Sequence, residues 1–158
     1  MAVDIGQEAI NRAAYQMGDR TLINKESIAS IDGTITSIDV WSYYDLTGLK
    51  VGTFYKTNGN TLKCRDSEAI AGTITKGSKV NKVVSLTVVT GDYIGCYYGV
   101  GRIEVDSTGY NGMWIVSGDK CTVGVSATYT FYADDALSLG GYIEGAAAAG
   151  RSFGFIIG

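Results

Sequence analysis

Residues 83–98, VVSLTVVTGDYIGCYY, decide the fold of this chain. Apolar side chains recur at every second position in both halves of the stretch, as in strands that bury one face. The dipeptide Gly91-Asp92 between the halves tolerates the positive φ angles of a tight turn. The stretch therefore predicts a hairpin at the centre of a β-sandwich, with a packing role. The two in-phase sets are Val84, Leu86 and Val88, and Ile94, Cys96 and Tyr98.

Short strand-like segments separated by turn signals occupy most of the remaining chain. TNGN at 57–60 predicts a second hairpin, KGSK at 76–79 a turn, and STGYNG at 107–112 a loop. Turn signals at a spacing of roughly 8 to 12 residues are typical of sandwiches and jelly rolls. The sequence therefore predicts an all-β chain, a single antiparallel β-sandwich that is jelly-roll-like, with extended N- and C-terminal arms.

The length of 158 residues fits one domain. Residues 1–30 have a loosely helical spacing of apolar residues and are predicted to form an N-terminal arm with about one helical turn. The β-sandwich domain is expected at 31–144, and a C-terminal apolar arm at 145–158.

The C-terminal arm, GAAAAGRSFGFIIG, ends in an apolar string that is costly to leave in water. Two interpretations stay open. The string folds back as an edge strand of its own domain, or it adds to a neighbouring subunit by strand augmentation. In the second case the subunit-docking residues are Phe153, Phe155, Ile156 and Ile157.

The composition excludes several classes of function. A net charge of −3 gives no basic patch for phosphates, so we expect no nucleic-acid partner. No window is apolar enough to span a membrane, and the first residues lack the pattern of a signal peptide, so we expect no membrane partner and synthesis in a cytoplasm.

The absence of histidine excludes Ser-His-Asp and Cys-His nucleophiles and histidine-ligated metals. Glu104 and Asp106 share one strand face near Arg102 and Tyr110, and we interpret them as a solvated face or an ion pair with Arg102 rather than as a catalytic pair. We therefore expect no catalytic residues, no cofactor and no metal ligands. Calcium bound by aspartates in turns stays open as an alternative. Those aspartates are Asp92, Asp106, Asp119, Asp134 and Asp135.

Three cysteines are too few for a disulfide framework, and their spacing matches no zinc site. Cys96 is in phase with its apolar neighbours and is expected to be a buried thiol. Cys64 lies between Lys63 and Arg65 and is expected to be exposed.

Aromatic residues are the remaining functional signal. They form either part of the core or a flat stacking platform for sugar rings, and the exposure of Trp114 distinguishes the two. The candidate platform residues are Trp41, Tyr43, Tyr44, Tyr110 and Trp114.

A set of landmarks spread over roughly residues 4–144 resembles a recurrent small β-sandwich module of phage virion proteins and uncharacterised environmental microbial sequences. The landmarks are GTITSIDVW, VGTFY, RDSEAI, VVTGDYIGCYYGVGRIEVDSTGYNGMW and YADDALSLGG. The resemblance implies a jelly-roll-like fold with a structural or attachment role, and it supplies no catalytic residues.

These observations lead to one main expectation and one alternative. The main expectation is a non-enzymatic structural protein of a virion or similar assembly, such as a phage capsid decoration or another head or tail component. Its partners would be copies of itself or other virion proteins, and its location the virion. The alternative is a carbohydrate-binding or host-recognition β-sandwich module with a surface glycan as its ligand.

Overall fold

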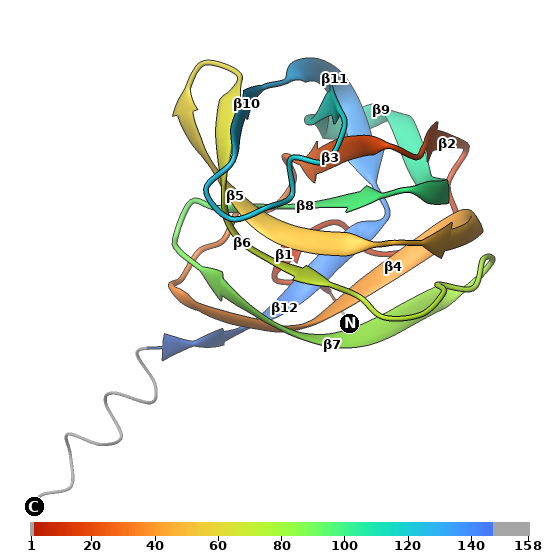
Figure 1. Cartoon of the computed structure of the whole chain (residues 1–158), viewed down its shortest axis with the longest axis horizontal. Helices are drawn as coiled ribbons and strands as arrows, with labels where there is room; N and C mark the ends of the chain where they lie inside the picture. The colour runs from red at the N-terminus through yellow and green to blue at the C-terminus, as the bar shows by residue number, and fades with distance from the viewer. Residues whose placement is uncertain (1, 147–158) are drawn as a thin grey trace, which may run out of the picture.

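The computed structural model describes residues 2–146, and every named element in this range is a strand (Figure 1). The predicted all-β fold with antiparallel strands is therefore confirmed, and the jelly-roll-like connectivity stays a prediction. The strands are β1 (Ile5–Gly6), β2 (Ala14–Met17), β3 (Arg20–Asn24), β4 (Gly33–Thr47), β5 (Lys50–Asn58), β6 (Thr61–Ala69), β7 (Lys79–Val88), β8 (Tyr93–Tyr98), β9 (Val100–Ser117), β10 (Ser126–Thr128), β11 (Thr130–Leu137) and β12 (Leu139–Gly145).

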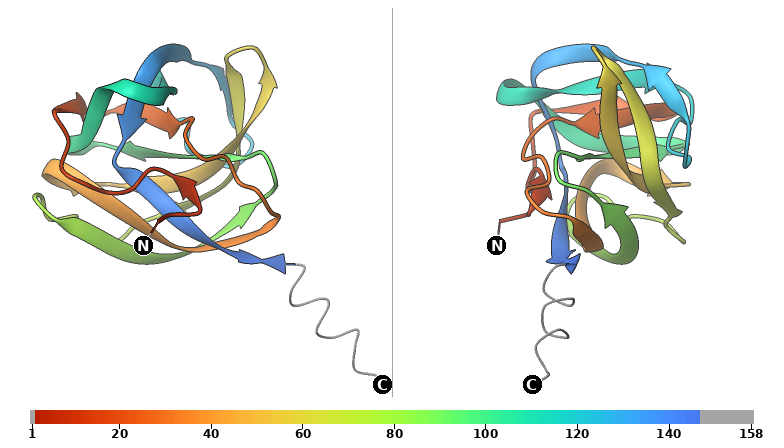
Figure 2. Two further views of the ribbon diagram at one scale, coloured as in Figure 1. Left: turned by 180° about the vertical axis from the view of Figure 1, so that it is seen from behind. Right: turned by 90° about the vertical axis from the view of Figure 1, so that its left-hand side faces the viewer.

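The strands pack as two layers joined by the long strand β4 (Figures 1 and 2). From Gly33 to Trp41, β4 pairs with β7 and β12 in one layer, which β1 extends beside β12. From Ser42 onward β4 pairs with β9 in the other layer, where the strand order is β9-β3-β8-β5-β6-β10. Strands β2 and β11 also pair with β9. Because β4 belongs to both layers, all twelve strands form one hydrogen-bonded network.

The stretch 83–98 has the predicted faces but a different pairing. Both in-phase sets are buried, whereas Val83 is 82% exposed. However, β7 pairs with β4, and β8 pairs with β3 and β5, so the predicted hairpin is wrong. The turn at Gly91 (φ 95°) carries the chain from one layer to the other. Alternation identifies the buried face of a strand, and it does not identify the neighbouring strand.

The N-terminal residues belong to the body of the fold, and the expected arm with a helical turn is wrong. Strand β3 lies between β8 and β9, and its Leu22 and Ile23 are both fully buried. A short central strand is buried on both faces and shows no alternation, which is why the sequence of this segment gave no strand signal.

The loop expected at 107–112 is also absent, because β9 runs through it while paired with β11. Two register shifts in this pairing, together with Gly109 (φ 89°) and Gly112 (φ 112°), show that the turn-like residues bend the strand and do not end it.

The interior contains two apolar clusters. The larger lies between the layers and includes Cys96. The smaller lies around Trp114 and includes Phe54, Cys64 and Cys121. Residues 2–146 contain no helix that is long and apolar enough to cross a membrane.

Candidate functional site

The structure separates the residues of the predicted aromatic platform. Trp114 is 1% exposed, its Nε1 donates a hydrogen bond to Asn60 Oδ1 at 3.0 Å, and its ring packs edge-on against Tyr93 at 4.9 Å. Trp114 therefore belongs to the core, and the predicted five-residue platform is wrong by the criterion that its exposure supplied. The Tyr110 ring is covered by the guanidinium of Arg12 at 5.2 Å, and no aromatic contact among the described residues joins it to the other candidates.

Tyr43 and Tyr44 are adjacent in β4, and both are nearly half exposed. Successive residues of a regular strand point to opposite faces, so this arrangement needs an irregularity. The pairing with β9 shifts between Ser42, opposite Ile103, and Tyr44, opposite Arg102. The resulting bulge turns both tyrosines outward while Ser42 stays buried.

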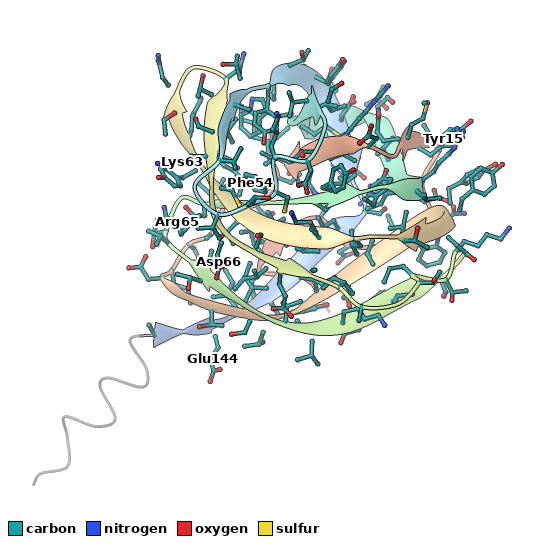
Figure 3. All side chains as sticks on the ribbon, viewed as in Figure 1. Tyr15, Phe54, Lys63, Arg65, Asp66 and Glu144 are labelled. Carbon is teal, nitrogen blue, oxygen red and sulfur yellow. The ribbon has the colours of Figure 1, made fainter. Side chains whose placement is uncertain are left out.

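Tyr15 and Arg102 complete an exposed group of side chains around this bulge. Tyr15, in β2, stacks on Tyr43 with ring centroids 4.8 Å apart and an interplanar angle of 18°. The Arg102 guanidinium lies 4.7 Å from the Tyr15 ring and 5.5 Å from the Tyr44 ring. We call Tyr15, Tyr43, Tyr44 and Arg102 the tyrosine surface. It lies at the end of the body marked by Tyr15 in Figure 3.

Two grooves flank the tyrosine surface, and Tyr44 and Lys76 line both of them. The first groove has a volume of about 560 Å³ and the second about 420 Å³. The first is also lined by Met17, Gly18, Asp45, Gly99, Val100, Gly101 and Arg102. The second is also lined by Asn11, Trp41, Ser42, Tyr43, Gly77 and Glu104.

Backbone contacts fix the walls of both grooves. The backbone N–H of Lys76 donates to Asp45 Oδ1 at 2.9 Å, and that of Gly77 donates to the carbonyl of Ser42 at 3.0 Å, which holds the 76–77 turn against β4. On the other side, Gly101 (φ 109°) lets β9 approach β4 so closely that a Cβ would lie 2.2 Å from the Asp45 carbonyl oxygen.

The buried Tyr98 links the two strands that carry Tyr15 and Arg102. The Tyr98 hydroxyl donates to the Gln16 carbonyl at 2.7 Å and accepts from the Ile103 N–H at 3.1 Å, so it joins β2 and β9 next to Tyr15 and Arg102. Burial raises the pKa of Tyr98 far above its ordinary value, so the hydroxyl stays neutral and remains a donor.

The second groove contains an unsatisfied polar atom. Ser42 is fully buried, and its Oγ is the one buried side-chain oxygen or nitrogen in residues 2–146 that has no hydrogen-bond partner. Buried hydroxyls are normally paired, so Ser42 Oγ is an exception, and its burial places it out of reach of a ligand in the groove. Glu104, on the same groove, is 3% exposed and accepts the backbone N–H of Arg12 at 2.6 Å.

Asp92, Asp106 and Asp119, three of the candidate aspartates, have structural partners. Asp106 forms an ion pair with Arg12 at 2.8 Å, and not with Arg102, which was one of the two interpretations offered by the sequence. Asp119 pairs with Lys50, and Asp92 with Arg65. Within residues 2–146 no group of three or more Cys, Asp or Glu side chains is placed to hold a metal ion.

Cys64 is 1% exposed, so its predicted exposure is wrong, whereas the predicted burial of Cys96 is confirmed. The predicted subunit-docking residues Phe153, Phe155, Ile156 and Ile157 lie outside the described residues.

Tyr15 and Arg102 are the site residues that sequence reasoning missed. Tyr15 lies in the segment taken as an arm, and Arg102 was considered only beside the carboxylates. The adjacent Tyr43 and Tyr44 were the available signal, because two neighbouring aromatics break the alternation of a strand.

Comparisons with known proteins give no further guide to the site. No family model matches the chain, and no curated protein or solved structure shows significant similarity to it.

Proposed function

We propose that the protein is a non-enzymatic recognition module that binds a saccharide at the tyrosine surface. The observation that carries this proposal is the meeting of three half-exposed tyrosine rings with two grooves whose walls mix polar and apolar residues.

The chemistry of a sugar fits this arrangement. A pyranose ring has apolar C–H faces that pack on aromatic rings, and Tyr combines such a ring with a polar tip. Its hydroxyl groups need donors and acceptors, which the second groove offers in Asn11, Lys76 and Glu104. Binding sites typically combine aromatic walls with a few fixed polar groups in this way.

A glycan array probed with the full chain tests the proposal. We expect bound glycans whose signal falls about tenfold in Tyr43→Ala, a loss that corresponds to about 1.4 kcal/mol. Tyr132→Ala is the matched control, because Tyr132 is 44% exposed and Tyr43 is 45% exposed. An array without hits, or hits that both variants retain, would contradict the proposal.

A second proposed role is structural, as a capsid decoration or another head or tail component of a virion. One observation favours it: β12 brings the chain to the surface at Gly145, and Glu144 lies at the opposite end of the body from Tyr15 (Figure 3). The apolar string at 153–157 would then dock on a neighbouring subunit at one end and leave the tyrosine surface free at the other.

Removal of residues 146–158 tests this second role. We expect the truncated chain to stay folded by circular dichroism and to lose the assembled mass seen by native mass spectrometry. An unchanged mass would contradict docking through the C-terminal residues.

A further inference from the structure

Two of the three cysteines meet in the smaller apolar cluster. Cys64 lies in β6, between Lys63 and Arg65 (Figure 3), and Cys121 lies in the connection from β9 to β10. They are 1% and 0% exposed. Cys96 belongs to the larger cluster, so it is not a member of this pair.

The backbone holds the two segments against each other. The Cys64 N–H donates to the Val125 carbonyl, and the Gly124 N–H donates to the Cys64 carbonyl, both at 2.9 Å. On the other side of Cys121, Lys50 Nζ binds Asp119 Oδ2 at 2.8 Å. The chain is therefore held in place both before Cys121, at Asp119, and after it, at residues 124–125.

Both sulfur atoms lie close to the strand segments around Gly52 and Asp66. Cys64 Sγ lies 3.4 Å from the Asp66 carbonyl oxygen. A Cβ at Gly52 would lie 2.8 Å from that same oxygen and 2.9 Å from Cys121 Sγ, so the glycine leaves the space that the Cys121 sulfur occupies beside the carbonyl that Cys64 contacts. The two thiols belong to the same seven-residue cluster, and the influence of each on the other lowers the pKa of Cys64 and raises that of Cys121.

We propose that Cys64 and Cys121 are a disulfide-forming pair that, once oxidised, joins the β9–β10 connection covalently to β6. Hydrogen peroxide is small enough to serve as the oxidant. The Cys64 thiolate attacks one peroxide oxygen and becomes a sulfenic acid, and the leaving hydroxide takes up a proton to give water. The Cys121 sulfur then attacks the Cys64 sulfur and releases a second water. Two thiols thus lose two hydrogens and two electrons, and peroxide is reduced to two waters.

Cys96 is a built-in reference thiol. Burial raises its pKa to about 12, so it is almost entirely protonated at neutral pH and should not react.

Mass spectrometry of the full chain tests the pair. The reduced protein is treated with peroxide, denatured, alkylated and digested with trypsin. We expect the peptide that contains Cys64 to be linked to the peptide that begins at Cys121, and Cys96 to be alkylated. We also expect the melting temperature of the oxidised protein to exceed that of the reduced protein by roughly 5–10 °C, because the link restrains the unfolded chain.

Two variants serve as controls. Cys96→Ser should form the link as the natural chain does, and Cys64→Ser should form none. Alkylation of both Cys64 and Cys121 after peroxide, their conversion to sulfinic acids without a link, or a link that involves Cys96 would each overturn the proposal. The natural chain and Cys96→Ser decide the question even if Cys64→Ser fails to fold.

Discussion

Arg12 gives the strongest test of the finding that the N-terminal residues belong to the fold. Its side chain is 1% exposed and donates to Ser138 Oγ at 2.6 Å, to Asp106 Oδ2 at 2.8 Å and to the Glu8 carbonyl at 2.8 Å. The substitution Arg12→Met keeps much of the apolar stem and removes all three donors.

The expected cost follows from the partners that remain. Removing one partner of a buried ion pair costs about 3–5 kcal/mol. The Asp106 side chain is 25% exposed, and water can therefore reach it, which places the cost at the low end of this range. The Ser138 hydroxyl still donates to the Ile10 carbonyl at 2.7 Å and is not left unpaired. We expect Arg12→Met to lower the free energy of unfolding by about 3 kcal/mol and the melting temperature by roughly 6–12 °C.

Urea unfolding followed by circular dichroism measures this change. Lys56→Met is the control, because Lys56 is exposed in β5 and its loss should change the free energy of unfolding by less than about 0.5 kcal/mol. If Arg12→Met also costs less than about 1 kcal/mol, the segment around Arg12 is not integrated as described and the reasoning fails.

Three further predictions concern single positions. Tyr98→Phe should lower the free energy of unfolding by about 1–3 kcal/mol in urea, because it leaves a buried backbone N–H without an acceptor; an unchanged midpoint would contradict this. Gly101→Ala should cost a similar 1–3 kcal/mol through its positive φ and its clash with Asp45, and a stable variant would show that β9 does not approach β4 so closely. The hydrogen bond that Tyr142 donates to Asp39 raises the pKa of Tyr142 from 10.0 to about 12, so its contribution to stability is complete below pH 10 and is lost as the pH rises through about 12. Absorbance titration should show a tyrosine that ionises near pH 12, and Tyr142→Phe should remove one tyrosine from that part of the curve.

Local patterns in the sequence predicted local structure well. Asn58-Gly59 forms the predicted turn between β5 and β6, with Asn58 opposite Thr61 and a φ of 53° at Gly59. The alternation in 83–98 identified the buried residues of β7 and β8 correctly. Both signals depend on neighbouring residues alone, which is why the sequence was sufficient.

Pairings between distant segments were not accessible from the same patterns. Strands β7 and β8 are adjacent in the chain and pair in different layers. Strand β3 lies at the centre of its layer, and its five residues, RTLIN, show no alternation. The segment was therefore read as an arm.

The candidate site was predicted only in part, for the same reason. Tyr43 and Tyr44 were recognised as aromatic candidates, but their common exposure depends on a bulge opposite β9. Tyr15 lies near them because β2 and β4 pair with the same segment of β9, one on each edge of that strand. No local sequence pattern predicts that arrangement. Trp114 was indistinguishable from an exposed aromatic until its partner Asn60 was known.

The most direct test of the central claim is a map of amide NMR shifts as a saccharide that binds on the array is added to the full chain. The account predicts shifts concentrated at residue 11 and at 15–18, 41–45, 76–77 and 99–104, the positions that form the tyrosine surface and line its grooves. Shifts concentrated at another face, or no shifts at saturating saccharide, would contradict it.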